Sequence, residues 1–230
     1  MSDFFNILKE QTTQEQDYLL AAPIIQRVFK GEASLEEYAS FLAQAYHHVK
    51  HTVPLMMLVG ARLTDDQEWL REAVAEYIEE EIGHQEWVLN DIAACGFDKE
   101  TVRCSQPQFA TEMMVSYAYD SIARKNPLSF FGMVHVLEGT SIALADGAAS
   151  NIANAVGLPQ KAFSYLTSHG ALDIEHVKFF ENLMNQITDE ADQQAILHGA
   201  KRFYRLYGDI FRGLDDEPFL KPIYKASRHE

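Results

Sequence analysis

The feature that most constrains the fold is a helical pattern that runs through almost the whole chain. Strands require β-branched or aromatic residues that alternate with polar residues between turns, and no convincing run of that kind is present. Helix signals recur instead. Ser34 with Glu37 three residues later has the spacing of a capping box, and Gly96 and Gly157 follow helical stretches as C-terminal caps do. The sequence therefore predicts an all-α protein.

The expected helices are joined by short links. They comprise two or three short helices within residues 3–30 interrupted near Pro23, a long helix over 35–63 bent at Pro54, and helices over about 65–94, 108–125, 126–156, 159–187 and 189–213. Residues 97–107 are the expected loop. No repeat period and no linker rich in Pro, Gly or Ser divides the chain. We therefore expect seven or eight helices in a single-domain bundle over residues 1–213, with a loosely attached tail over 214–230.

Composition excludes several classes of partner. With 34 acidic against 19 basic side chains in 230 residues, the formal charge is −15, which disfavours nucleic acid and anionic membranes. Cys95 and Cys104 form no CxxC pair, so we expect reduced structural thiols and no thiolate zinc site. The start lacks a basic and then apolar leader, and no apolar run reaches the ~18 residues of a membrane span. We expect a soluble, cytoplasmic protein.

Three polar residues on one predicted helix face carry the strongest site signal. At about 100° per residue, His169, Asp173 and His176 project within about 60° of one another. Apolar residues flank this stripe close to the same face, from Phe163 to Leu183, which indicates that the polar groups point inward. Buried titratable groups need partners, so we interpret the stripe as metal ligands in preference to a solvated polar face.

Two further segments supply carboxylates and a histidine. Glu81 and His84 have the E-x-x-H spacing with which bundle helices present ligands to a di-metal site, although the glutamates around them also fit a solvated acidic face. Glu138 is the only acid between Asp120 and Asp146 and is set among apolar and small residues. A buried carboxylate is commonly paired, raised in pKa or bound to a metal.

Other histidines are candidates for an additional ligand or a supporting role. His47, His48 and His51 lie on one predicted helix, and the sequence does not choose among them or exclude a polar surface face. His135 lies three residues before Glu138 on the same face, where we interpret it first as a supporting or core histidine and second as a ligand.

Together the candidate ligands are three carboxylates and three imidazoles without a thiolate, a set that suits iron or manganese. They are Glu81, His84, Glu138, His169, Asp173 and His176. The candidate walls of a substrate pocket are aromatic residues, which are equally expected in a plain core: Tyr46, Trp87, Phe130, Phe131 and Tyr165.

The order of these motifs, E-x-x-H, an isolated Glu and H-x3-D-x2-H, resembles that of the heme-oxygenase-like diiron oxidases, within the superfamily of TenA/thiaminase II and PqqC. The resemblance covers roughly residues 20 to 210. It implies a heme-oxygenase-like helical bundle, two iron ions, Glu138 as a bridging carboxylate, Glu81 with His84 as the pair from the earlier helix, and a homodimer. Many members place the first Glu and His seven residues apart, whereas Tyr77 stands seven before His84 here. One iron or two, and iron or manganese, therefore stay open.

Three functions compete. The leading hypothesis is a non-haem diiron oxidase or oxygenase that uses dioxygen and a small organic substrate. The first alternative is a metal-free enzyme like TenA or PqqC; thiaminase II needs a cysteine nucleophile opposite a carboxylate, and neither cysteine here lies in a motif of that family. The second alternative is a non-enzymatic helical binding protein that uses the acidic residues 76–86 as its contact surface. The sequence does not identify the substrate or the reaction type.

Overall fold

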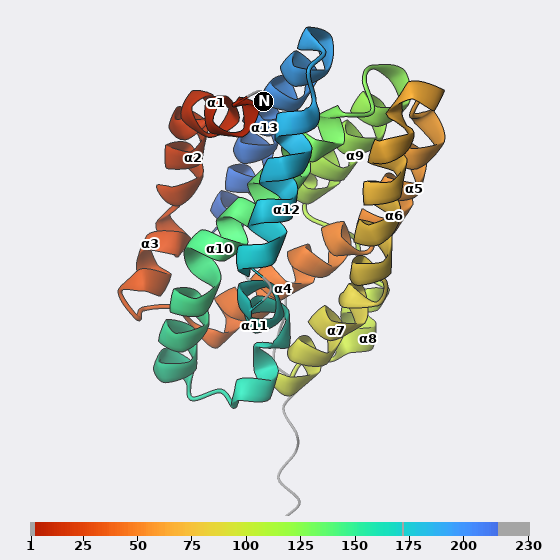
Figure 1. Ribbon diagram of the computed structural model, residues 1–230. Coiled ribbons are helices and arrows are strands. Elements are labelled where there is room, and N and C mark those ends of the chain that lie inside the picture. The colour runs from red at the N-terminus through yellow and green to blue at the C-terminus, as the bar shows by residue number, and fades with distance from the viewer. Residues whose placement is uncertain (1–2, 172, 216–230) are drawn as a thin grey trace, which may run out of the picture.

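The computed structural model describes residues 3–171 and 173–215, with all of their side chains except those of residue 146 and residues 168–176. Within these residues the chain forms helices and short 3-10 turns, and no strand (Figure 1). The elements are α1 (Phe4–Gln11), α2 (Thr13–Leu20), α3 (Pro23–Phe29), α4 (Leu35–Val49), α5 (Thr52–Arg62), η1 (Asp65–Gln67), α6 (Glu68–Glu81), α7 (His84–Ala94), α8 (Lys99–Arg103), α9 (Phe109–Arg124), α10 (Ser129–Val156), η2 (Gln160–Ala162), α11 (Ser164–Ala171), α12 (Asp173–Gln186) and α13 (Glu190–Gly213). The all-α prediction is confirmed. The helices outnumber the seven or eight expected because several expected helices are divided.

The expected helix over 35–63 is two helices. α4 ends and α5 begins on either side of Lys50 and His51, so the chain does not bend at Pro54 as predicted. Proline lacks an amide hydrogen, and in a helix interior its ring clashes with the preceding turn. Pro54 instead lies in the first turn of α5, where a backbone N–H would have no helical partner.

The expected helix over 65–94 is also divided, at the position that matters most for the candidate site. α6 ends at Glu81 and α7 begins at His84, with Ile82 extended and Gly83 at φ +96°. Glycine adopts this left-handed conformation without the steric cost that a Cβ imposes. The E-x-x-H pair therefore flanks a break between two helices instead of lying on one.

The expected helix over 159–187 is likewise divided, because Phe163 separates η2 from α11. His169 belongs to α11, whereas Asp173 and His176 belong to α12. Residue 172, between the two, lies outside the described residues, so one uninterrupted helix under these three residues stays a prediction.

Several predicted helix ends are confirmed by their caps. Ser34 Oγ accepts a hydrogen bond from Glu37 N at 3.1 Å, and Glu37 Oε2 accepts one from Ser34 N at 2.7 Å, which completes the capping box of α4. Gly157, at φ +69°, ends α10. The expected loop over 97–107 differs from the prediction, because Asp98 caps a short helix, α8, within it.

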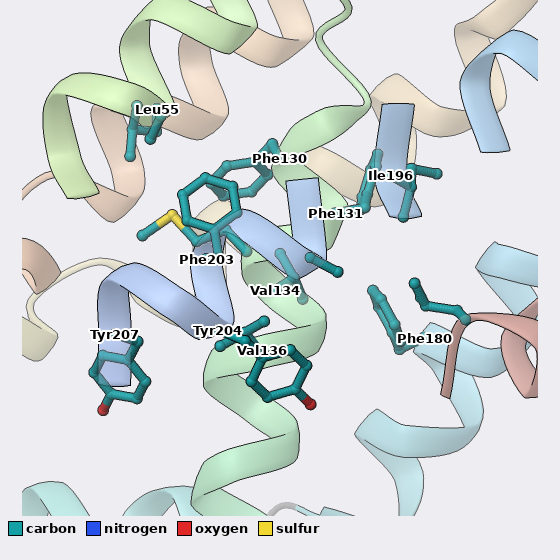
Figure 2. Close-up of a cluster of buried hydrophobic side chains, with 14 of the residues drawn as sticks. Leu55, Phe130, Phe131, Val134, Val136, Phe180, Ile196, Phe203, Tyr204 and Tyr207 are labelled. Atoms are coloured by element: carbon teal, nitrogen blue, oxygen red, sulfur yellow. The ribbon is translucent and has the colours of Figure 1, made fainter. Parts of the chain in front are cut away.

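α10 is the central helix, and α13 packs along it more extensively than any other pair of helices in the described residues. Their backbones meet at two glycines. A Cβ on Gly132 would lie 2.4 Å from Ala200 N, and a Cβ on Gly199 would lie 2.6 Å from Ser129 O. Aromatic and aliphatic side chains of both helices fill the core around this crossing (Figure 2).

A second group of buried apolar side chains lies among α4, α7, α11 and the C-terminal half of α10, in the lower part of Figure 1. Tyr38 and Phe163 stack within it with ring centroids 5.1 Å apart. At the end of α13, Leu214 is buried in the first group and Asp215 forms an ion pair with Arg27. In the described part of the chain, no helix has the length and apolar character needed to cross a bilayer.

Candidate functional site

The break between α6 and α7 forms the centre of the candidate site. His84 Nδ1 lies 3.1 Å from Glu81 Oε2, and a carboxylate can only accept, so the imidazole donates. His84 is buried, and its ring centroid lies 4.2 Å from that of Trp87. A carboxylate acceptor at Nδ1 orients the ring and leaves Nε2 as the nitrogen suited to a metal, an arrangement common around metal-bound histidines.

The charge of Glu138, in α10, affects the pKa of Tyr77 in α6. Burial raises the pKa of the Tyr77 phenol, and the negative charge of Glu138 raises it further, followed by those of Glu80, Glu76 and Glu81. Tyr77 is buried, and its hydroxyl has no hydrogen-bond partner among the described residues. The buried phenol therefore lies within electrostatic range of Glu138 and of the glutamates in the last turns of α6.

Three of the six predicted ligands, His169, Asp173 and His176, have side chains outside the described residues. Their helices are placed. α11 packs against α7 and α10. α12 runs beside Tyr77, because Phe179 meets the Tyr77 ring edge to face at 5.4 Å. The helices that carry the H-x3-D-x2-H motif therefore border the region of the α6–α7 break.

Among the side chains that the structure describes, Glu81 and His84 meet, and Glu138 does not join them in a cluster. No three His, Cys, Asp or Glu side chains of this set gather closely enough to hold a metal ion. The donors nevertheless fit iron chemically, since carboxylate oxygens and an imidazole without a thiolate are donors that iron accepts. The buried Tyr77 hydroxyl, without a described partner and under carboxylate charge, supports the fit.

Asp91 of α7 anchors the start of α11. Its side chain is buried; Oδ1 accepts hydrogen bonds from Ser164 N at 3.1 Å and from the Ser164 hydroxyl, and Oδ2 accepts one from Tyr165 N at 2.8 Å. Burial raises the pKa of Asp91 despite the opposing effect of these hydrogen bonds. The carboxylate satisfies the first N–H groups of α11. It thereby joins the helix that carries His169 to the helix that begins at His84.

Two of the three histidines near the end of α4 have partners away from the predicted ligands. His47 Nε2 lies 2.9 Å from Ser105 Oγ, and burial lowers the pKa of His47 to about 4. His51 Nδ1 lies 3.1 Å from the Tyr119 hydroxyl. His48 is buried, with its ring edge to face against an aromatic ring of α13. His47 and His48 are both buried, and His48 is the one that packs against α13.

An apolar cavity of about 80 Å³ lies between α3, α4, α10, α11 and α13. Tyr165 and Tyr207 line it. Burial raises the pKa of the Tyr165 phenol, with smaller contributions from Tyr207 and from the negative charge of Glu81. Tyr165 therefore lies within electrostatic range of Glu81.

The predicted pocket walls are mostly core residues. Phe130 and Phe131 pack in the core beside α13 (Figure 2), and Tyr46 is buried in the second apolar group. Trp87 is 38% exposed. Of the five predicted residues, Tyr165 is the one that lines the apolar cavity.

A larger cleft, of about 430 Å³, lies between α1, α2, α10, α12 and α13, and Glu138 lines it. His135 lines it too, with Nε2 3.4 Å from Thr12 Oγ1 and its ring stacked on Phe180 at 6.2 Å. Burial lowers the pKa of His135 to about 4, and the positive charge of Lys9 contributes. Pockets of roughly 300–1,000 Å³ hold small molecules. This cleft is large enough to bring one to Glu138.

Reasoning from the sequence missed Tyr77 and Asp91 as parts of the site. Asp91 carried a usable signal, because it is a single acid between the apolar residues Leu89 and Ile92, as Glu138 is in its own helix. Tyr77 carried none beyond its position, since a tyrosine at helical spacing is typical of a core.

Comparisons with known proteins identify the family and the fold. A family model described as an iron-containing redox enzyme matches residues 39–208. No curated protein matches the chain.

Solved structures match over nearly the whole chain. A domain of unknown function with a heme oxygenase-like fold from Shewanella denitrificans shares 24% identity at a TM-score of 0.85, over 94% of this chain and 93% of that chain. A TenA homolog from Pseudomonas syringae pv. tomato shares 11% identity at a TM-score of 0.77, over 94% of each chain. Heme oxygenase-2 from Synechocystis, in complex with heme and NO, shares 15% identity at a TM-score of 0.76, over 94% of this chain and 86% of that chain.

At these identities the structural likeness shows the fold, which is heme-oxygenase-like, as the resemblance in the sequence predicted. The family model covers well over half of the chain and extends from α4 through most of α13. The chain therefore belongs to the family of iron-containing redox enzymes.

Proposed function

We propose that this protein is a non-haem diiron enzyme that activates dioxygen to oxidise a small organic substrate. The observation that carries the proposal is the hydrogen bond between buried His84 and partly buried Glu81 across the α6–α7 break. The Tyr77 phenol, whose pKa the charges of Glu138 and Glu81 raise, belongs to the same region. The family contributes the identity of the metal, iron. The donor types of this chain suit iron held directly by side chains.

The residues that would hold the metal are Glu81, His84, Glu138, His169, Asp173 and His176. Bound iron would supply the electrons and the open coordination positions for the reduction of dioxygen. Within the protein, Glu81 orients the His84 ring through Nδ1, and Asp91 holds the start of α11 against α7. These contacts support the ligand-bearing helices on both sides of the proposed centre.

The α1–α2 side of α10 offers the route for the substrate. The cleft of about 430 Å³ is lined by Glu138 and by apolar side chains such as Phe180 and Ile142. Thr12 and His135 add polar groups to its wall. Small-molecule sites combine mostly apolar walls with a few placed polar groups in this way. A compact, largely apolar molecule with one polar end suits the cleft.

The apolar cavity beside Tyr165 does not fit haem, although a structural neighbour binds haem. The apolar cavity beside Tyr165 has a volume of about 80 Å³, far below the ~300 Å³ from which pockets hold drug-sized ligands. A macrocycle would have to displace the side chains that form its wall.

A TenA-like reaction through a cysteine nucleophile also finds little support. Cys95 is buried, and burial raises the pKa of its thiol to about 12, so it stays protonated at neutral pH. Cys104 is exposed at the end of α8. Neither thiol lines the apolar cavity or the cleft beside Glu138.

Anaerobic titration of the full chain with Fe(II) tests the proposal. We expect retention of two iron ions per chain by elemental analysis, and an absorption change on exposure to dioxygen. His84→Gln and Glu138→Gln should each lower the iron content. His198→Gln, which removes an exposed histidine of α13, is the matched control and should not.

Three results would overturn the proposal. The first is a wild-type protein that retains no iron. The second is unchanged iron content in both ligand variants. The third is stoichiometric haem binding that persists in them.

A further inference from the structure

A cleft on the opposite side of α2 from the cleft beside Glu138 has an unusual charge. It lies between α2 and α13, which pack side by side (Figure 1), and its volume is about 480 Å³. Four of its lining residues can carry positive charge: His198, Lys201, Arg202 and Arg205. This size falls within the range of pockets that bind small molecules.

The positive charge is concentrated and uncompensated. The chain as a whole carries −15, yet these four side chains come from eight consecutive residues of α13 with the 3–1–3 spacing of one helix face. None of the four forms an ion pair with a residue that the structure describes. Glu15 is the one acid among the lining residues. The neighbouring Asp209 accepts a hydrogen bond from the Tyr18 hydroxyl.

Two arginines hold the cleft in shape. The guanidinium carbons of Arg205 and Arg212 lie 3.7 Å and 3.6 Å from the centre of the Tyr18 ring. Arg212 donates to Tyr18 O at 2.6 Å and to Gly208 O at 2.9 Å, and so joins α2 to α13. Stacking on Tyr18 restrains the Arg205 guanidinium and leaves its N–H groups available at the edge of the plane.

The electrostatics of a neighbouring side chain agree with an open cationic site. Burial lowers the pKa of His198, and the positive charges of Arg202 and Lys125 lower it further. His198 is therefore uncharged at neutral pH, and the positive charge of the cleft is that of Lys201, Arg202 and Arg205. A concave surface of one sign concentrates ligands of the other sign.

We propose that the α2–α13 cleft binds a small soluble molecule that carries a diphosphate or triphosphate group. Arginine forks match phosphate oxygens. The three cations in the cleft, Lys201, Arg202 and Arg205, call for a ligand with several negative charges. The concave shape favours a small molecule over a broad macromolecular surface.

The ligand would also stiffen the wall of the cleft beside Glu138. α2 contributes Thr13 and Gln16 to the Glu138 side and Glu15 and Tyr18 to the cationic side. On α13, Tyr204 lines the cleft beside Glu138 and Arg205 lines the cationic cleft. A ligand that bridges α2 and α13 therefore restrains two helices of the substrate cleft. This consequence rests on the proposed function, whereas binding itself does not.

Calorimetric titration of the full chain with inorganic pyrophosphate tests the site, with and without iron. We expect saturable binding that weakens as ionic strength rises. The triple variant Lys201→Gln/Arg202→Gln/Arg205→Gln should weaken it by at least about tenfold. The control Lys30→Gln/Lys99→Gln/Lys161→Gln removes the same charge elsewhere and should bind pyrophosphate as the wild type does.

If the wild-type protein binds pyrophosphate but does not retain iron, the proposed function is refuted and the proposal for this cleft is not. The site is refuted if wild type shows no saturable binding, or if both triple variants weaken binding equally. Capture by polyglutamate or by anionic phospholipid vesicles, without binding of pyrophosphate in solution, would also overturn it.

Discussion

Asp91 offers the sharpest test of how this fold holds its site. The Asp91→Ala substitution removes the acceptor for Ser164 N, for the Ser164 hydroxyl and for Tyr165 N. An unsatisfied buried N–H costs roughly 1–3 kcal/mol, and loss of a helix cap costs about 1 kcal/mol. Tyr165 N is buried and Ser164 N partly so. Release of the buried carboxylate, whose pKa burial raises, offsets part of this cost.

We expect Asp91→Ala to lower the free energy of unfolding by about 3 kcal/mol. For a chain of this length that corresponds to a fall in Tm of about 6–12 °C, which thermal unfolding followed by circular dichroism measures. Asp91→Asn keeps the shape and one acceptor oxygen, so its loss should be about half as large. Hydrogen exchange should accelerate in α11, because the effect begins at its first turn.

Asp98→Ala is the matched control for this prediction. Asp98 also caps a helix, accepting from Glu100 N at 3.0 Å and from the Thr101 hydroxyl at 2.8 Å, but it does so at the surface. Its loss should cost no more than about 1 kcal/mol. The reasoning fails if Asp91→Ala is no more destabilising than Asp98→Ala, or if exchange in α11 does not change.

Three further predictions follow from packing and charge. Gly132→Ala should lower the free energy of unfolding, measured by chemical unfolding, by several kcal/mol, because its Cβ would lie 2.4 Å from the backbone of α13. The control Gly60→Ala, whose Cβ would have its nearest neighbour at 3.7 Å, should be neutral or stabilising. Equal effects of the two substitutions would contradict this prediction. The pKa of His135 falls from 6.5 to about 4 on folding. The contribution of this neutral side chain to the free energy of unfolding is therefore complete above pH 6.5 and is lost as the pH falls toward 4. That contribution is about 3 kcal/mol. His135→Gln should therefore reduce the loss of unfolding free energy between pH 6.5 and pH 4, and an unchanged loss would refute the lowered pKa of His135. A thiol reagent should modify Cys104 quickly and Cys95 only on unfolding, since Cys95 is buried with its pKa raised to about 12; equal rates in mass spectrometry would show otherwise.

The sequence alone determined the fold class and the types of residue in the proposed site. Helix caps are local, so the Ser34 capping box and the glycine at 157 could be identified from neighbouring residues. An isolated acid in an apolar helix, as at Glu138, also indicates from its neighbours in the sequence that the carboxylate lies among apolar side chains. These features require no knowledge of what lies across the bundle.

Only the tertiary structure decided where the long helices divide and what each polar side chain meets. Helical residues stand on both sides of the turns at Lys50 and at Gly83, so the sequence alone predicted no boundary at either position. Likewise His47 meets Ser105, far away in sequence. Asp91 binds α11 in the same long-range way. Partners of this kind are set by the three-dimensional path of the chain, and the local spacing of residues does not predict them.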